Sequence, residues 1–245
     1  MERIEILETF VDNLSMMETV AVVDSFIIDR RPLHLMGVNA DKINELRKEP
    51  ELKKIINSCD VINADGASVV WASKVLGKPL KERVAGIDLM YKLIELAEKK
   101  GYSVYFLGAK QHIVEETVRV VKKEHPALKI IGYRNGYFSR EEWPIIADEL
   151  DRVSPQIVFV GITSPLKEYL VEYLQKKLHC VFMGVGGSFD VISGNIFRAP
   201  KWMQNMGMEW MFRVMQEPGR LWKRYFFGNI EFIMSVYREK YRKRR

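Results

Sequence analysis

The stretch CVFMGVGGS, residues 180–188, decides the fold of this chain. Its apolar residues, 180–185, predict a short buried strand, which Gly184, Gly186 and Gly187 then end. A strand that runs into a glycine turn exposes backbone N–H groups, and α/β proteins use such groups to hold phosphate. We therefore predict that these glycines and Ser188 bind a diphosphate. A tight turn required only by packing would need the same glycines and stays open as the alternative.

Apolar runs and amphipathic stretches alternate on the amino-terminal side of this segment. This alternation is typical of an α/β fold with a mainly parallel sheet that helices cover on both faces. The opening RIEILETFV predicts a small strand or hairpin at an edge of the sheet. The strands are predicted at 33–38, 60–64, 103–108, 128–133, 156–161 and 180–185, and the helices near 14–29, 40–56, 67–76, 87–100, 110–124, 140–151 and 166–177.

The charge of the chain is concentrated near its carboxyl end. A length of 245 residues fits one α/β catalytic core, placed at 1–195, with a helical appendage at 196–245. The appendage holds 12 Lys and Arg against 4 Asp and Glu, while the core is slightly acidic. Such asymmetry suggests an anionic membrane or a nucleic acid as partner. Because no signal sequence and no run of about 18 apolar residues is found, we expect a cytoplasmic protein.

The sequence predicts no metal site and no cofactor. Cys59 and Cys180 adjoin apolar runs and are expected to be buried free thiols. The four histidines are scattered without the spacing of metal ligands. No D-x-D pair, which many nucleotide-sugar enzymes use to hold a divalent ion, is present.

Polar or glycine-rich residues follow the predicted strands. In parallel sheets, ligands bind beyond the carboxyl ends of the strands, so these residues predict a pocket there. The absence of G-x-G-x-x-G and of G-x-x-x-x-G-K-[ST] argues against a dinucleotide oxidoreductase and a P-loop NTPase. The strand ends in question are 37–39, 63–66, 108–110, 161–164 and 184–188.

Asp65 is the strongest catalytic candidate. It follows an apolar strand and precedes Gly66, so its carboxylate would face the pocket. A partly desolvated carboxylate there could deprotonate a hydroxyl nucleophile, provided its pKa is raised. The alternative is that Asp65 caps the helix that follows.

Two further side chains are predicted to contact substrate. Arg83 precedes a glycine turn and could clamp a phosphate, although a salt-bridged surface arginine fits the local sequence too. Asn39 could bind a sugar or a base edge, with capping of the 40–56 helix as the alternative. Asp88 is expected to cap its helix or to lie in the first turn.

The segment 199–243 is predicted to be helical, with breaks near Pro218-Gly219 and at Gly228. Basic residues recur among Trp, Phe, Met and Ile, a pattern typical of helices that lie in a bilayer interface. Each basic residue near an anionic surface contributes roughly 1 kcal/mol to such binding. A set of core-packing helices with solvated charges is the alternative. Nucleic acid is not expected, because no recognition motif accompanies the charge.

Several motifs resemble the WecG/TagA/CpsF family of glycosyltransferases (glycosyltransferase family 26) over almost the whole chain. The motifs are N-A-D-G at 63–66, K-x-x-x-x-R-V-A-G-x-D-L at 78–89, G-Y-F at 136–138, M-G-V-G-G-S-F-D-V-I-S-G at 183–194, R-A-P at 198–200 and G-x-E-W-x-x-R-x-x-x-E-P-x-R at 207–220. The resemblance implies a bacterial inverting, metal-independent enzyme on a Rossmann-like sheet. It would move a sugar from a UDP donor to a polyprenyl-diphosphate-linked sugar in the synthesis of capsule, teichoic acid or a related polysaccharide.

The resemblance also implies roles for particular residues and partners. Asp65 would be the base, Arg83 would contact phosphate, and the appendage would touch the inner face of the cell membrane and complete the active site. Self-association is possible. The further residues predicted to bind substrate are Asn63, Lys167, Asp190, Arg213, Arg220 and Arg224.

Two departures from the family pattern lie at the expected pocket rim. Gly37-Val38-Asn39 stands where teichoic-acid-type members carry T-P-N, and 165–168 read P-L-K-E where many members have P-K-Q-E. The donor could therefore be UDP-glucose, UDP-galactose or UDP-N-acetylmannosamine. A non-catalytic protein that binds UDP-sugars or lipid diphosphates at the membrane is the alternative function.

Overall fold

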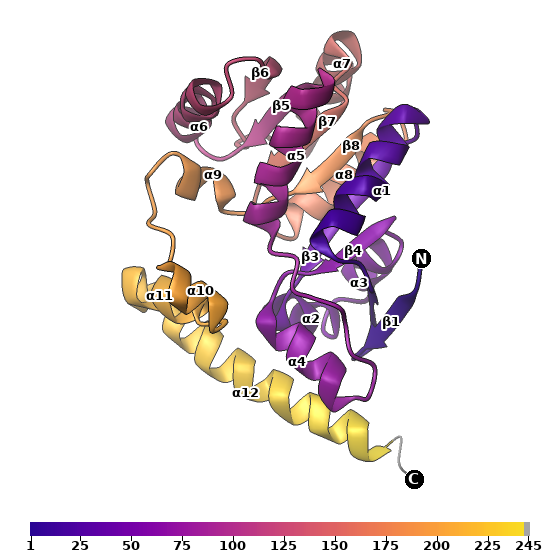
Figure 1. The fold of residues 1–245 in the computed structure, drawn as a ribbon, viewed down its shortest axis with the longest axis vertical. Coiled ribbons are helices and arrows are strands. Elements are labelled where there is room, and N and C mark those ends of the chain that lie inside the picture. Colours follow the sequence, from indigo (N-terminus) through magenta and orange to yellow (C-terminus); the bar gives the residue numbers. More distant parts are fainter. Residues whose placement is uncertain (243–245) are drawn as a thin grey trace.

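The computed structural model describes residues 1–242, apart from the side chains of Asn205 and Arg220, and has a six-stranded parallel sheet at its centre. Its strands are β3 (Leu33–Val38), β4 (Val61–Ala64), β5 (Ser103–Gly108), β6 (Lys129–Arg134), β7 (Ile157–Gly161) and β8 (Val181–Gly184). They are hydrogen-bonded in the order β4-β3-β8-β7-β5-β6 (Figure 1). All six strands predicted from the sequence are confirmed, each boundary within one residue.

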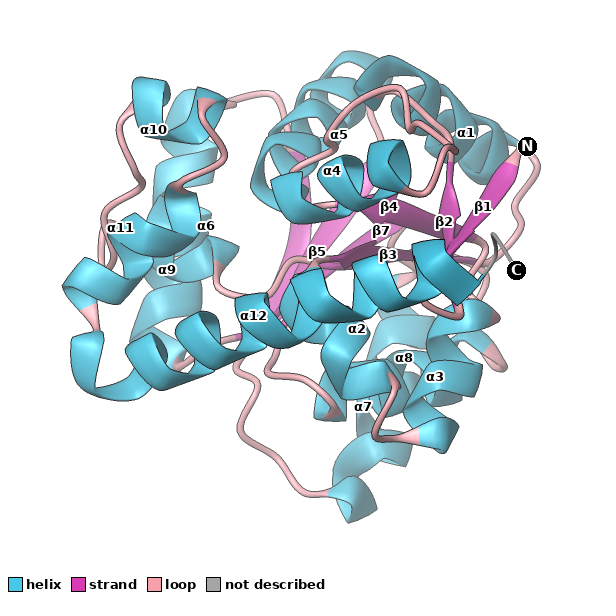
Figure 2. Cartoon of the chain, turned by 90° about the horizontal axis from the view of Figure 1, so that it is seen from below, coloured by secondary structure: helices cyan, strands magenta, loops and turns pink. Residues whose placement is uncertain are grey.

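Helices cover both faces of the sheet, as Figure 2 shows from below. The predicted α/β fold with a parallel sheet between helices is confirmed. One face carries α1 (Met16–Ile28), α5 (Gly86–Lys100) and α6 (Gln111–Glu124), and the other carries α2 (Ala40–Leu46), α3 (Pro50–Asn57), α4 (Ala67–Val75), α7 (Trp143–Val153) and α8 (Leu166–Gln175).

Successive residues of the strands are buried on opposite faces. Phe106 and Phe159 belong to the core beneath α1, α5 and α6, whereas Tyr105 and Val158 belong to the core beneath α7 and α8. Because both faces are covered, the strands are continuously apolar rather than alternating. Cys59 and Cys180 are buried free thiols in this interior, as predicted.

The opening residues form a separate hairpin of β1 (Arg3–Ile6) and β2 (Thr9–Asp12). The Asp12 carboxylate accepts a hydrogen bond of 2.8 Å from the backbone N–H of Ile62 in β4, the edge strand. The hairpin predicted at an edge of the sheet is therefore confirmed.

Three local features differ from the predicted helices. The 40–56 helix is divided into α2 and α3, because Pro50 occupies the first turn of α3 and cannot continue the preceding helix. The 140–151 helix begins with a 3-10 turn, η1 (Arg140–Glu142). A short helix that the sequence did not predict, α9 (Ser188–Ile192), follows β8 and buries Phe189 against the sheet.

The carboxyl-terminal segment forms α10 (Lys201–Asn205), α11 (Glu209–Gln216) and α12 (Pro218–Arg242). The predicted break near Pro218 is confirmed, but the predicted break at Gly228 is wrong, because α12 continues through it. A glycine costs a helix only about 1 kcal/mol, which side-chain packing readily offsets. Here the Gly228 carbonyl also accepts a hydrogen bond of 2.7 Å from the Asn44 side chain of α2.

One face of α12 is packed on the rest of the chain (Figure 1). Phe232 and Val236 are buried in the same core cluster as α2 and α4. The Glu239 carboxylate accepts a hydrogen bond of 3.1 Å from the backbone N–H of Leu7. Within residues 1–242, no helix combines the length and the apolar character needed to cross a bilayer. The division of the chain at 195/196 stays a prediction.

The burial of α12 generates a stability test. Phe232→Ala removes a ring that is 1% exposed, whereas Phe227→Ala removes one that is 60% exposed. We expect Phe232→Ala to lower the free energy of unfolding by about 3–5 kcal/mol and Phe227→Ala by at most about 0.5 kcal/mol. Urea titration of both variants measures this. Equal losses would show that α12 is not packed as described.

Candidate active site

A cavity of 1810 Å³ opens at the carboxyl ends of the strands. The loops after β3, β4, β5, β7 and β8 contribute to its walls, together with α11 and α12. The pocket predicted at the strand ends is therefore present. Every predicted site residue lines it except Arg220, whose side chain lies outside the described residues.

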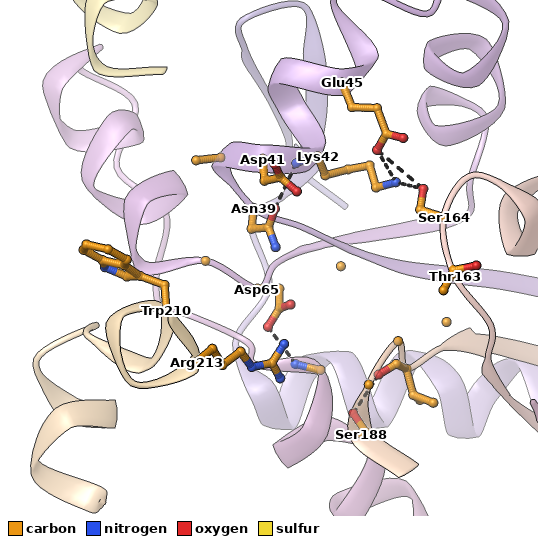
Figure 3. Close-up of a pocket in the computed structure, with 18 of the residues that line it drawn as sticks. Asn39, Asp41, Lys42, Glu45, Asp65, Thr163, Ser164, Ser188, Trp210 and Arg213 are labelled. Carbon is orange, nitrogen blue, oxygen red and sulfur yellow. Dashed lines mark hydrogen bonds and ion pairs between the residues drawn. The ribbon is translucent and has the colours of Figure 1, made fainter. Parts of the chain in front are cut away.

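Asp65 faces this cavity directly after β4 (Figure 3). Its backbone N–H donates to the carbonyl of Val38 at 3.0 Å, and its Oδ1 accepts from the backbone N–H of Gly86 at 2.9 Å. The N-cap of α4 is Gly66, without a side-chain cap, so the alternative that Asp65 caps this helix is wrong. The carboxylate is oriented by the main chain of the 84–86 loop instead.

Gly37 leaves room for this carboxylate. A Cβ at position 37 would lie 3.0 Å from the Cβ of Asp65 and 3.7 Å from its Oδ2. The residue of β3 that departs from the family pattern is thus a direct neighbour of the candidate base.

Arg83 is held from two sides. Its Nε donates to the carbonyl oxygen of Asp65 at 2.6 Å, and its Nη2 forms an ion pair with Glu209 of α11. The salt-bridged alternative is therefore confirmed. Because Arg83 also lines the cavity, its contact with a phosphate stays a prediction.

Glu209 also forms an ion pair with a second arginine, Arg198. Arg198 donates two hydrogen bonds of 2.7 Å to the carboxylate of Asp88, and its Nε lies 3.5 Å from Glu209 Oε1. Burial alone would raise the pKa of Asp88, but Arg198 holds it below its ordinary value. Asp88 lies in the first turn of α5, as predicted. The sequence motif contained Glu209 and Arg198 but gave no sign that they meet.

The two asparagines at the strand ends, Asn39 and Asn63, differ in the hydrogen bonds that their side-chain amides form. The Oδ1 of Asn39 caps α2 by accepting from the backbone N–H of Lys42 at 2.9 Å, so the capping alternative holds for that atom. Asn63 is 1% exposed, and its Oδ1 accepts from the hydroxyl of Thr19 at 3.2 Å. Among the described residues its Nδ2 has no hydrogen-bond partner, although the side chain lines the cavity. A buried unpaired donor at a cavity wall favours binding of an acceptor atom.

The glycine turn after β8 is open at Gly186 and Gly187, which both line the cavity. Gly186 has a φ of +52°, and a Cβ at Gly186 or Gly187 would meet nothing within 4 Å. Ser188 is committed to the turn, since its N–H and its hydroxyl both donate to the Val185 carbonyl, at 3.1 and 2.7 Å. The exposed amides are thus expected from Gly186 and Gly187 rather than from Ser188. Asp190 follows on the cavity wall.

A buried cluster of charges forms the wall between α2 and α8. Glu168, which is fully buried, lies 2.8 Å from the Nζ of Lys167 and 3.0 Å from the Nζ of Lys42. Lys42 also contacts Glu45 at 2.8 Å and the hydroxyl of Ser164 (Figure 3). Burial lowers the pKa of Lys167, and although burial would raise that of Glu168, the two lysines lower it to about 2.

This cluster was only partly predictable. Lys167 was identified by its place in the motif, whereas Lys42, Glu45 and Ser164 carry no motif and meet only in the folded chain. Gly184 is needed beside them, because a Cβ there would lie 2.8 Å from the sulfur of Met36 and 3.1 Å from the Cε of Lys167.

Cationic side chains of α11 and α12 also line the cavity. Arg213 is exposed and points from α11 toward Asp65 (Figure 3). Arg224 donates to Asp41, with Nε at 2.8 Å from Oδ2, and this hydrogen bond raises its pKa. A carboxylate opposite arginines can remove a proton on one side of a reacting group and stabilise a departing anion on the other.

Acid should weaken the folded state through Glu168. Because its pKa of about 2 lies below the ordinary value of 4.5, its contribution is complete above about pH 4.5 and is lost as the pH falls toward 2. We expect the free energy of unfolding to fall more steeply over this window in the parent than in Glu168→Gln, which cannot titrate. Urea titrations across the window measure this, with Glu172→Gln on the same helix as the control that keeps the parent's slope. Parallel curves for the parent and Glu168→Gln would refute the assignment.

Known proteins from two Bacillus species are similar to this chain. Over 181 residues the chain is 38% identical to an N-acetylglucosaminyldiphosphoundecaprenol N-acetyl-beta-D-mannosaminyltransferase of Bacillus spizizenii, which covers 74% of this chain and 69% of that protein. A protein of the same name from Bacillus subtilis is 33% identical over 198 residues, which is 80% of this chain and 76% of the relative. Residues 4–245 match the profile of a single family. The resemblance seen in the sequence is confirmed, and the chain is a glycosyltransferase that belongs to the glycosyl transferase WecG/TagA/CpsF family.

Proposed function

We propose that this enzyme transfers a sugar from a UDP donor to a polyprenyl-diphosphate-linked sugar, with inversion and without a metal ion, in the synthesis of a bacterial cell-surface polysaccharide. The observation that carries the proposal is the position of Asp65. Its carboxylate faces a cavity that Arg213 and Arg224 also line, and Arg213 points toward Asp65 (Figure 3). This arrangement supplies a base and a charged site for a leaving diphosphate within one pocket.

The reaction is a direct displacement at the anomeric carbon. Asp65 accepts the proton of the acceptor hydroxyl while that oxygen forms a bond to the anomeric carbon. The bond from this carbon to the β-phosphate oxygen breaks on the opposite face, so the configuration inverts and UDP leaves with the electron pair. Because Asp65 Oδ1 is held by the N–H of Gly86, the base is oriented before the acceptor arrives.

The negative charge of the leaving UDP is stabilised by groups of this chain. The amides of Gly186 and Gly187, with Arg213, Arg224 and Arg220, are the groups proposed for this role, and preorganised donors of this kind contribute about 3–4 kcal/mol each in enzymes. Arg83 contacts phosphate from the core side, since its guanidinium retains donors beyond those used by Asp65 and Glu209.

We further propose UDP-N-acetylmannosamine as donor and N-acetylglucosaminyl-diphosphate-lipid as acceptor. The names of the two Bacillus relatives support this choice. Asn39, Asn63 and Asp190 offer polar groups to the sugars along the cavity wall. Gly37 and Lys167 occupy positions at which the chain departs from the family pattern, so UDP-glucose and UDP-galactose belong in the donor screen.

Asp65→Asn tests the proposed base. We expect this variant to lose about 10²–10⁴-fold in the rate of UDP release with lipid acceptor, because it cannot take the hydroxyl proton, while it still binds UDP. Asp148→Asn, which changes an exposed aspartate of α7, is the matched control and should keep the parental rate. The assay is run in excess chelator, where the parent should be fully active.

Three outcomes would contradict the proposal. Asp65→Asn could turn over at the parental rate, or the parent could need a divalent ion. A parent that binds UDP-sugar and lipid acceptor but releases no UDP would instead favour the non-catalytic binding protein.

An exposed apolar stripe of α12 favours contact with a lipid bilayer. Phe232 and Val236 are buried on one side of this helix. A second stripe of apolar residues, each at least 40% exposed, runs along the same helix. We propose that this stripe lies in the interface of the inner face of the cell membrane, with Lys223 and Arg238 beside it meeting anionic lipids. The stripe consists of Trp222, Phe226, Ile230, Ile233, Tyr237 and Tyr241.

A double substitution measures this contact without removing the buried side of α12. Trp222→Ser with Phe226→Ser should weaken sedimentation with vesicles of anionic phospholipid about tenfold or more, because two interfacial aromatic rings are lost. Ile145→Ser, which changes an equally exposed apolar residue on α7, should bind as the parent does. Equal vesicle affinity of the double variant and the parent would refute the proposed orientation.

A further inference from the structure

We infer that Glu209 is a positioning residue, which couples the docking of α11 to the conformation of the Asp65 loop through the ion pairs Asp88–Arg198–Glu209–Arg83. This inference rests on the proposed function, since it assigns Asp65 the role of base. Glu209 lies 126 residues from Arg83 along the chain, so the contact exists only when the carboxyl-terminal helices are docked.

At one end of this series of ion pairs, Arg83 contacts the loop that carries Asp65. Arg83 Nε donates to the Asp65 carbonyl at 2.6 Å. The residues after Arg83 hold the same strand end, because the N–H of Val84 donates to the Ala64 carbonyl at 2.9 Å and the N–H of Gly86 donates to Asp65 Oδ1 at 2.9 Å. A displacement of Arg83 is therefore transmitted directly to the carboxylate of Asp65.

The other end is fixed to α5. Arg198, in the connection between α9 and α10, makes a bidentate pair with Asp88 at 2.7 Å and approaches Glu209 at 3.5 Å. The side chains of Arg83, Arg198 and Glu209 are only 19–25% exposed, so their ion pairs are less screened than surface pairs. Glu209 is thus held between two arginines that belong to the core and to the connection.

Glu209 shares its helix face with a second functional group. Arg213 follows it by one helical turn, and residues four apart lie on the same side of a helix. Figure 3 shows Arg213 pointing from α11 toward Asp65. The ion pair of Glu209 with Arg83 therefore sets the separation between the base and an arginine that meets the leaving group. Small errors in this separation are costly, since a misplacement of about 1 Å can reduce a rate about a hundredfold.

Competition with the substrate is the opposite interpretation, in which Glu209 occupies the phosphate site of Arg83. Among the described residues, the guanidinium uses only Nε and Nη2 for its protein partners. Since it carries five N–H donors, it can bind phosphate while Glu209 stays in place. The two interpretations predict opposite effects of removing the carboxylate.

The test compares Glu209→Gln with Arg198→Gln, their double variant and Glu231→Gln. The last is the matched control, because Glu231 of α12 also pairs with the core, with Lys48 at 3.0 Å, but at an exposed site. The measurements are kcat and KM for UDP release, vesicle binding, thermal unfolding, and hydrogen exchange of the amides of residues 62–66 and 83–86.

We expect Glu209→Gln to reduce kcat about 10- to 100-fold, with KM for the UDP-sugar and vesicle binding near the parental values. Hydrogen exchange should accelerate at 62–66 and 83–86. Arg198→Gln should change kcat and exchange in the same direction, and the double variant should be no worse than Glu209→Gln, because both residues act through one contact. Glu231→Gln should match the parent in every measurement.

Four results would overturn the inference. The first is a parental kcat in Glu209→Gln, and the second is a higher kcat, which would indicate competition with the substrate. The third is a loss of activity that only parallels weaker vesicle binding or a lower melting temperature. The fourth is unchanged hydrogen exchange of the Asp65 loop. Failure of the proposed function can be distinguished from failure of this inference, because the parent enzyme itself would then release no UDP. Hydrogen exchange would still show whether Glu209 holds the Asp65 loop.

Discussion

Parallel pairing of the strands is the constraint on which the site depends. It brings the carboxyl ends of β3, β4, β5, β7 and β8 to one edge of the sheet, where their loops line a single cavity. Asp65 and the glycine turn of β8 are separated by about half of the chain, yet this pairing brings both to the same cavity. Glycine is required at those strand ends where the backbones of neighbouring strands approach closely. A Cβ at Gly108, for example, would lie 2.5 Å from the carbonyl carbon of Gly161.

The helices after residue 196 line the cavity and pack against the core. Phe232 and Val236 share a core with α2 and α4, which fixes α12 beside the strand ends. The arginines that line the cavity differ in their partners. Arg83 and Arg224 are paired with Glu209 and Asp41, whereas Arg213 is exposed toward the base. A leaving diphosphate would thus meet cations whose positions are already set by carboxylates, and such preorganisation lowers the cost of stabilising charge.

The repeating pattern of the sequence was sufficient to predict the sheet, because strands buried on both faces are apolar throughout. Asp65 and the glycine turn could be assigned to one pocket for the same reason, because each follows a strand. Arg83 lies in the connection between α4 and α5, and its signal was the motif that contains it. Contacts between distant side chains were beyond reach. Arg83 meeting Glu209 and Lys42 meeting Glu168 depend on how helices are docked, and no local pattern encodes that. Gly228 does not break α12, because the packing of Phe232 outweighs the low helix propensity of glycine. Asn39 both caps α2 and lines the cavity.

The most direct measurement of the central claim is a crystal structure of the enzyme with UDP bound. The account predicts that the β-phosphate lies between the amides of Gly186 and Gly187 and the guanidinium of Arg213, with the Asp65 carboxylate facing it across the space for the sugar. A diphosphate bound outside this cavity, or an Asp65 carboxylate turned away from the β-phosphate, would contradict it.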